Sequence, residues 1–353
     1  MINLDDHTRF TQLDPQGMLA EIDGLPDQLQ TAWRLGQAQE LPAWQGIQNV
    51  LISGMGGSAI GADLVAAYIL PVCKAPVFIH RDYGLPAWAS GPETLVIACS
   101  HSGSTEETLT SFEQALNAGC RCLAFTTGGR LAGMARQAGT PLWTFEHSGQ
   151  PRAAVGYTFG LLLAAFARLG LIGDPSVELE DAVQAMRRQQ ETIGASVPVV
   201  QNLAKRLAGQ FMDRWVVVFG SGLLAPVARR WKGQINEVAK AWAQFELLPE
   251  ADHNTLAGTA NPEALISRTL TIFLSAPSEH PRNQLRTGLT RKTFMLEGMN
   301  TDLIEAKGDS ALAHMWTLLH LGDYTAYYLA MVYGVDPTPV TILEEFKYEL
   351  GDF

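Results

Sequence analysis

The stretch NVLISGMGGSAIGADL, residues 49–64, joins a short apolar, β-branched run to a helical pattern through a glycine-rich turn. Further apolar runs of strand length follow, separated by segments of helical pattern, and they lie at 75–80, 95–100, 120–127 and 141–146. Strands and helices that alternate in this way are typical of a parallel sheet covered by helices on both faces. We therefore predict an α/β fold with a doubly wound parallel sheet.

The second half of the chain repeats this pattern. RWVVVFGSGLLAPVARR, residues 214–230, again runs from an apolar strand through Gly-x-Gly into a helix, which we expect to continue to residue 243. Strand and helix patterns then alternate at 268–276, 281–298, 301–308 and 311–333. The similarity between the two strand–turn–helix segments predicts duplication of one α/β unit. Two unrelated strand–helix turns are the alternative, because glycine is needed wherever a strand turns tightly into a helix.

The chain length of 353 residues predicts two domains. We expect two doubly wound sheets, with helical segments before and between them. The predicted ranges are a helical lead-in at 1–45, a first domain at 46–172, a helical connector at 173–200 and a second domain at 201–353.

Composition excludes several classes of partner. The chain carries 25 Lys and Arg against 36 Asp and Glu, a net charge of −11, without any basic run, so we expect no nucleic acid. The first twenty residues have neither a basic nor an apolar leader region, which predicts a cytoplasmic protein. The apolar stretch at 153–173 contains Arg168 and several glycines, so we predict a buried helix and no membrane partner. The four cysteines are interpreted as reduced core residues.

Two turns have the composition of an anion site. Gly56, Gly57 and Ser58 open a helix just after a strand, where free backbone N–H groups meet the positive end of the helix dipole. The motif lacks the Gly-Lys-Ser/Thr of a P-loop, and His80 and Arg81 stand where a dinucleotide site would have an acid. A nucleotide site is therefore not expected.

The second such turn is SHSGSTEET, residues 100–108, which follows the strand at 95–100. Hydroxyls of Ser100, Ser102 and Thr105, with the amides around Gly103, are suited to the terminal oxygens of a phosphate. Helix capping is the alternative interpretation of these residues, and both interpretations can be true at once. In that interpretation Ser104 or Ser102 is the N-cap, and Glu106 or Glu107 completes a capping box.

Together, GMGGSAIG and SHSGSTEET resemble the sugar isomerase (SIS) domain, whose paired turns bind a phosphosugar. QINEVAKAWAQFELLPEADHN, residues 234–254, resembles the bifunctional phosphoglucose/phosphomannose isomerases, and the similarity extends over about residues 45–350. The resemblance implies two SIS domains and interconversion of glucose 6-phosphate or mannose 6-phosphate with fructose 6-phosphate. It also implies that no cofactor or metal is needed, and that the chain forms a homodimer with composite active sites.

Aldose–ketose isomerisation requires a base that moves a proton between adjacent carbons and a group that opens the sugar ring. By resemblance, Glu237 is the base and His253 opens the ring from the neighbouring subunit. Taken on pattern alone, the favoured interpretation of Glu237 is a solvent-facing helix residue that pairs with Lys240. His253 is then an exposed loop histidine.

The resemblance assigns two cations to the same reaction. Arg152 would stabilise the enediolate, and Lys347 would lie beside the ring-opening histidine. Without the resemblance, Arg152 is a helix-terminal arginine that reaches solvent, and Lys347 is a helical partner of nearby acids.

The motif departs from the family pattern at two positions. Val238 stands where the family often has asparagine, and Thr255 stands where it often has glutamate. Thr338 and Thr341 are both near the place of a small hydroxyl residue that the family associates with tolerance of both C2 epimers. Rival functions are a phosphosugar-binding regulator without catalysis, an aminosugar-phosphate isomerase and a purely structural dimer.

Overall fold

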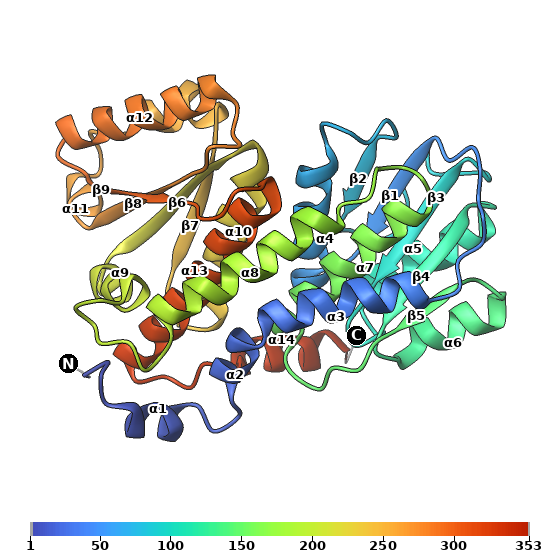
Figure 1. The fold of residues 1–353 in the computed structure, drawn as a ribbon, viewed down its shortest axis with the longest axis horizontal. Helices are drawn as coiled ribbons and strands as arrows, with labels where there is room; N and C mark the ends of the chain where they lie inside the picture. Colours follow the sequence, from blue (N-terminus) through green and yellow to red (C-terminus); the bar gives the residue numbers. More distant parts are fainter. Residues whose placement is uncertain (1–2, 352–353) are drawn as a thin grey trace. The chain divides into compact units, whose positions relative to one another are not determined.

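The computed structural model describes residues 3–351, which pack as two compact units (Figure 1). The N-terminal unit comprises Gly24–Arg187 and Gly308–Trp316. The C-terminal unit comprises the described residues up to Asp23, Arg188–Lys307 and the described residues from Thr317 onward. The predicted helical lead-in at 1–45 is thus divided between the two units. Its described residues up to Asp23 belong to the C-terminal unit, and those from Gly24 onward belong to the N-terminal unit. The four predicted domain ranges stay predictions.

The N-terminal unit contains a five-stranded parallel sheet in the order β2-β1-β3-β4-β5. Its strands are β1 (Asn49–Ser53), β2 (Val77–His80), β3 (Thr94–Cys99), β4 (Arg121–Thr126) and β5 (Leu142–Thr144). β1 lies between β2 and β3, with Ser53 opposite His80 and Ala98. The predicted doubly wound parallel sheet is therefore confirmed in this half.

Helices cover both faces of this sheet (Figure 1). One face packs on α5 and α6 through a core that includes Leu51, Val96, Phe112 and Leu131. The other face carries α4 and α7, with α3 lying along α7. These helices are α3 (Leu25–Ala38), α4 (Gly56–Ile69), α5 (Glu106–Asn117), α6 (Gly129–Ala138) and α7 (Val155–Arg168).

The apolar stretch at 153–173 forms the buried helix α7, as predicted. Gln28 of α3 fixes its start, because the Gln28 side-chain amide donates to the Ala153 carbonyl at 2.9 Å and accepts from the Gly156 amide at 2.7 Å. Within residues 3–351, no helix combines the length and the apolar character needed to cross a membrane.

The C-terminal unit contains a four-stranded parallel sheet in the order β7-β6-β8-β9. Its strands are β6 (Trp215–Ser221), β7 (Ala243–Leu248), β8 (Thr269–Ser275) and β9 (Asn300–Glu305). β6 lies between β7 and β8 as β1 lies between β2 and β3, and β9 matches β4. The order of the strands thus supports the duplication that the two Gly-x-Gly turns indicate.

Most helices of the C-terminal unit match the sequence pattern, with one error. α10 ends at Glu237 rather than at 243, and β7 follows it, a strand that the pattern did not predict. The helix stops because Lys240 adopts a left-handed backbone with φ of 53°. The remaining helices are α1 (His7–Leu13), α2 (Met18–Asp23), α8 (Ser176–Ile193), α9 (Leu203–Phe211), α10 (Ala225–Glu237), α11 (Glu263–Ile266), α12 (Pro281–Leu296), α13 (Ala311–Tyr333) and α14 (Thr341–Gly351).

A buried ion pair holds α10 against α13. The Arg230 guanidinium donates to both carboxylate oxygens of Asp323, from Nε at 3.0 Å and from Nη2 at 2.6 Å. Each side chain is only 3% exposed. Paired donors and acceptors of this kind offset the cost of removing two charges from water, and they fix the register of the two helices.

The same helix contact generates a stability prediction. A Cβ at Gly322 of α13 would lie 2.2 Å from Nε1 of the buried Trp231, which donates to the Leu318 carbonyl at 2.8 Å. We expect Gly322→Ala to lower the free energy of unfolding by about 1–3 kcal/mol, because the indole must move. Gly233→Ala on α10, where a Cβ meets no atom within 4 Å, should stabilise by roughly 0.5–1 kcal/mol. Urea unfolding of both variants measures the contrast, and equal effects would contradict it.

Candidate active site

The serine-rich turn after β3 is a compact hydroxyl and amide cluster. Ser100 is 2% exposed, and its Oγ lies 2.9 Å from Thr105 Oγ1 while accepting from the Gly103 amide at 3.1 Å. Ser102 is exposed, and its Oγ accepts from the Ser104 amide at 3.3 Å. The predicted phosphate hydroxyls of Ser100 and Thr105 are therefore brought together in the structure.

The capping prediction for this turn is wrong in one respect. The N-cap of α5 is Thr105, not Ser104 or Ser102, and its side chain makes no capping hydrogen bond. Instead the Thr105 hydroxyl faces Ser100. Glu106 and Glu107 lie in the first turn of α5, where a carboxylate stabilises the positive end of the helix dipole.

Close contact between main chains shapes this turn. Gly103 has φ of 67°, and a Cβ there would lie 1.9 Å from the Gly128 carbonyl oxygen. Gly129 also has φ of 67°, and a Cβ there would lie 2.3 Å from the Ser102 carbonyl oxygen. The turns after β3 and β4 thus pack backbone against backbone, and only glycine fits at either position.

The turn after β1 lies beside the serine-rich turn. A Cβ at Gly54 would lie 3.0 Å from the Cys99 carbonyl oxygen at the end of β3. α4 then begins at Gly56, with φ of 52° and without a side-chain cap, and Ser58 is buried in its first turn. Amides at the start of α4 therefore keep their hydrogen-bonding capacity for a ligand.

Arg152 reaches the same place. It lies in the short 3-10 turn Pro151–Ala153 before α7, is 6% exposed, and donates from Nη1 to Gln150 Oε1 at 3.2 Å. A Cβ at Gly57 would lie 2.4 Å from the Pro151 carbonyl oxygen and 3.2 Å from the Arg152 Cα. The absence of a side chain at Gly57 thus lets the arginine-bearing turn pack against the start of α4.

Two histidines next to this site were not predicted. His101, inside the serine-rich turn, approaches His147 with 2.9 Å between Nε2 and Nδ1. The His147 ring also stands at right angles to His101 and near Tyr157. His101 could have been predicted as a site residue from its place within SHSGST. Nothing in the sequence around His147 connects that residue to the motif.

In the C-terminal unit, Glu237 is the last residue of α10 and is half-buried. Lys240, the helical partner considered for it, points its ammonium at main-chain oxygens. It donates to the carbonyls of Glu237 at 3.0 Å, Val238 at 3.3 Å and Asp336 at 2.7 Å. A cation at this end of the helix satisfies carbonyls that have no partner within α10.

His253 lies in the short helical turn Glu250–His253 that follows β7, and its side chain is exposed. The preceding residue anchors the turn to α12. Asp252 accepts from Arg286 Nη1 at 2.8 Å and from Thr290 Oγ1 at 2.6 Å. These two hydrogen bonds fix the turn that carries His253 to α12.

Glu237 and His253 lie near opposite ends of the strands of the C-terminal sheet. α10 runs antiparallel to the strands and ends before β7 begins at Ala243, whereas His253 follows the end of β7 at Leu248. At about 3.3 Å per residue, the length of β7 separates the two regions by roughly 16 Å. Within one C-terminal unit the two predicted catalytic residues therefore belong to segments at opposite ends of β7.

Lys347 lies on α14, whose described residues are all exposed, including Ile342, Phe346 and Tyr348. Its predicted proximity to His253 stays a prediction.

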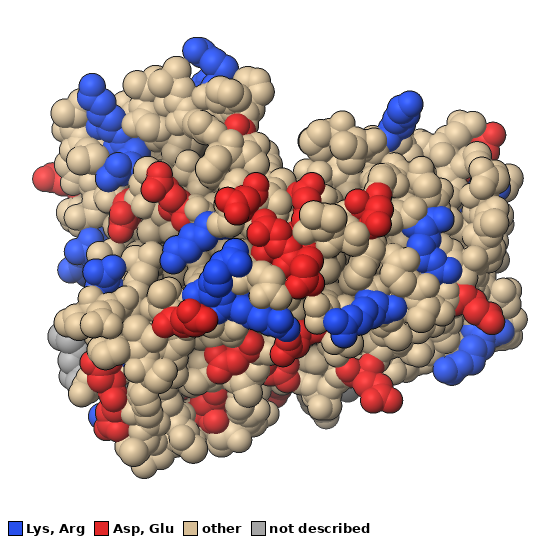
Figure 2. Space-filling model, viewed as in Figure 1, with Lys and Arg blue, Asp and Glu red and all other residues tan. Residues whose placement is uncertain are grey.

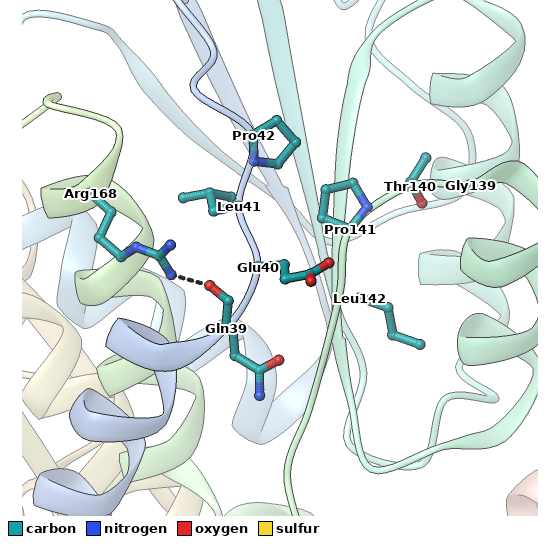
Figure 3. A pocket seen from close by; sticks show the side chains of 9 residues that line it. All are labelled: Gln39, Glu40, Leu41, Pro42, Gly139, Thr140, Pro141, Leu142 and Arg168. Atoms are coloured by element: carbon teal, nitrogen blue, oxygen red, sulfur yellow. Dashed lines mark hydrogen bonds between the residues drawn. The ribbon is translucent and has the colours of Figure 1, made fainter.

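A cavity of about 790 Å³ lies elsewhere in the N-terminal unit (Figure 3). It opens at the amino ends of the strands, between the end of α3 and the start of β5. The Arg168 guanidinium on its wall donates to the carbonyls of Gly36 at 2.7 Å and Gln39 at 2.6 Å. None of the predicted site residues lines this cavity, and its cation is engaged by the main chain.

Comparison with known proteins gives the family. A family model described as the bacterial phospho-glucose isomerase C-terminal SIS domain matches residues 200–350. The bifunctional phosphoglucose/phosphomannose isomerase of Caldicellulosiruptor bescii is 38% identical, over 95% of this chain and 99% of its own. The chain belongs to the bifunctional phosphoglucose/phosphomannose isomerase family.

Further similarities agree with this family. The isomerase of the same name from Aquifex aeolicus is 34% identical, over 89% of this chain and 92% of its own. A crystal structure of a glucose-6-phosphate isomerase like protein from Thermus thermophilus has a TM-score of 0.64 at 21% identity. It covers 97% of this chain and 100% of that chain, and at this identity it supports the fold alone.

The two departures from the family motif have local explanations. Val238 is fully buried at the end of α10, so this position packs in the core instead of supporting the site with a polar group. Thr255 donates from its amide and its hydroxyl to Asn254 Oδ1, at 2.6 and 3.0 Å. Asn254 in turn donates to Glu250. Hydrogen bonds within the turn thus order the segment that carries His253.

The geometry of the serine-rich turn predicts the effect of removing its hydroxyls. We expect Ser100→Ala to weaken binding of inorganic phosphate by roughly 10-fold or more, because a charge-assisted hydrogen bond is worth about 1.5–3 kcal/mol. Ser104→Ala is the matched control, since Ser104 is exposed and its hydrogen bond to Ser102 Oγ comes from the main-chain amide, which the substitution keeps. Isothermal titration of both variants measures the difference. Equal affinities would refute the assignment of Ser100.

The anchor of the His253 turn gives a second prediction. Asp252→Ala removes the acceptor of both Arg286 and Thr290, so the turn should shift and turnover should fall by an order of magnitude or more. Phosphate affinity should stay unchanged, because the serine-rich turn belongs to the other unit. Glu263→Ala, an exposed acid on α11, is the control. Unaltered kcat in Asp252→Ala would contradict the role of the anchor.

Proposed function

We propose that the chain is a cytoplasmic isomerase that interconverts glucose 6-phosphate and mannose 6-phosphate with fructose 6-phosphate through a cis-enediolate. The observation that carries this proposal is the meeting of two glycine-rich turns and Arg152 at the carboxyl edge of one sheet. Ligands of parallel α/β sheets bind at this edge. Its hydroxyls, amides and one guanidinium suit an anionic sugar phosphate.

The phosphate would be held by neutral donors. Ser100, Ser102 and Thr105 supply hydroxyls, and the start of α4 supplies Ser58 and the amides of Gly56 and Gly57. The dipole of α4 adds positive potential where the charge is needed. Basic side chains are not gathered into a single patch on the face shown in Figure 2, where Lys and Arg alternate with Asp and Glu.

Four side chains act on the sugar in this mechanism. His253 passes a proton to and from the ring oxygen and so opens the pyranose. The Glu237 carboxylate then removes the proton on C2 and returns it to C1. Arg152 stabilises the negative charge that develops on the enediolate oxygens, and Lys347 assists near His253. None of these steps requires a metal or cofactor.

One intermediate explains both substrates. Removal of the C2 proton makes C2 planar, so glucose 6-phosphate and mannose 6-phosphate, which differ only at C2, give the same enediolate. Protonation at C1, with transfer of the hydroxyl proton from O2 to O1, gives fructose 6-phosphate from either. The site need only tolerate both orientations of the C2 hydroxyl before proton removal.

The separation of Glu237 and His253 supports a homodimer. Ring opening and proton transfer act on neighbouring atoms of one sugar, yet the two residues lie at opposite ends of β7. A second copy of the chain would supply His253 to the Glu237 of the first, and a two-fold axis would build two such sites.

The chemistry is tested by measuring fructose 6-phosphate formed from glucose 6-phosphate and from mannose 6-phosphate. Glu237→Gln should lose turnover by at least roughly 10³-fold, because an amide cannot accept the proton, while inorganic phosphate still binds. Binding without turnover in the unmodified chain would favour a phosphosugar regulator. Turnover of glucosamine 6-phosphate alone would favour an aminosugar isomerase.

The shared site is tested by complementation. Mixing inactive Glu237→Gln and His253→Ala chains, with exchange of subunits, should restore up to about a quarter of the unmodified activity. Half of the random dimers are then mixed, and each mixed dimer has one intact site. As the control, Glu237→Gln is mixed with the double variant and should stay inactive. No recovery despite subunit exchange would rule out the composite site.

A further inference from the structure

The C-terminal sheet has a counterpart of the proposed phosphate site. In each sheet the first strand in sequence, β1 or β6, pairs with a strand on either side, and ligands bind where the strand order reverses. That point lies between β1 and β3 in one unit and between β6 and β8 in the other. Both turns also share a backbone feature, because Gly56 and Gly222 are each the second glycine of a Gly-x-Gly sequence and have φ of 52° and 46°.

A side chain of the protein itself fills this position in the C-terminal unit. Glu279 is 6% exposed, and its carboxylate bridges the ends of β6 and β8. It accepts a hydrogen bond from the Ser221 hydroxyl at the end of β6, and a second from the Ala276 amide after β8 at 2.8 Å. Ser221 and Ala276 are themselves buried. These donors are a hydroxyl and a backbone amide, the same types that the serine-rich turn offers.

The residues around Glu279 differ from those of the first turn. Leu223 and Leu224 stand where the first turn has Gly57 and Ser58, and Pro226 lacks an amide proton in the first turn of α10. Gln284 ties down the loop after β8, donating to the carbonyls of Ala276, Pro277 and Glu279, each at 3.2 Å. Burial raises the pKa of Glu279, whereas the hydrogen bonds from Ser221 and the Ala276 amide act in the opposite direction and favour the carboxylate.

We propose that Glu279 is an internal anion that permanently occupies the ligand position of the second sheet, so that each chain binds one phosphosugar. The C-terminal unit then supplies catalytic groups, and the N-terminal unit alone supplies the phosphate site. The count of one site rests on the proposed function, whereas the occupation by Glu279 does not.

The occupation is tested by refilling the position with a small carboxylate. Glu279→Ala removes the anion and leaves Ser221 and the Ala276 amide without their acceptor, so the Tm should fall by several degrees. Sodium formate should recover part of that loss in a saturable way, since a ligand that binds only the folded state stabilises it. Sodium chloride at equal ionic strength should not. Glu297→Ala, an exposed acid at the end of α12, is the matched control and should show no formate effect.

A second variant keeps the test decisive if Glu279→Ala does not fold. Glu279→Gln retains the shape and one carbonyl acceptor, so it should fold, and Ser221→Ala should destabilise it less than it destabilises the unmodified chain. Equal destabilisation in both backgrounds would overturn the proposal. So would a formate effect of the same size in Glu279→Ala and in Glu297→Ala.

The number of sites is measured by titration with a five-carbon phosphorylated acid that mimics the enediolate. We expect one molecule per chain, and loss of all binding in a Ser100→Ala, Thr105→Val double variant. Two molecules per chain would overturn the proposal. If formate rescues Glu279→Ala but the serine-rich turn binds no ligand, the proposed function fails while the internal anion stands.

Discussion

In the N-terminal unit β1 and β3 pair in parallel with Ser53 opposite Ala98, and this register places the ends of both strands at one edge of the sheet. The predicted phosphate site depends on that edge. The start of α4 and the serine-rich turn meet there because parallel neighbours deliver their following turns to the same side. Arg152 joins them because Gly57 has no side chain to keep the Pro151 carbonyl away.

The two halves use one architecture for different purposes. In the first sheet the strand order reverses between β1 and β3, and the turn at this point has glycine and serine at the start of α4. In the second sheet the Glu279 carboxylate bridges the ends of β6 and β8, and the proposed catalytic residues lie away from it, at the end of α10 and beyond β7. Duplication of a binding fold thus supplies a second scaffold whose ligand position is no longer needed for binding.

Much of the fold and part of the candidate site could be predicted from the sequence, because the strands of a parallel sheet appear in the sequence as apolar runs that end in glycine-rich turns. The alternation, the buried helix α7 and the serine-rich turn all followed from local residues. β7 did not, because its residues are only half-buried and the left-handed Lys240 that ends α10 carries no glycine signal. The Thr105 cap and the His101–His147 contact depend on tertiary neighbours that no local pattern encodes.

The backbone contact between Gly103 and Gly128 also bears on how a ligand would be received. Two turns locked main chain to main chain cannot open and close as a flap does, so the hydroxyls and amides they present are already ordered before any ligand arrives. The entropy of arranging those donors is lost once, when the chain folds, instead of at each binding event. Association should then proceed in a single kinetic step, without a slow rearrangement at the phosphate.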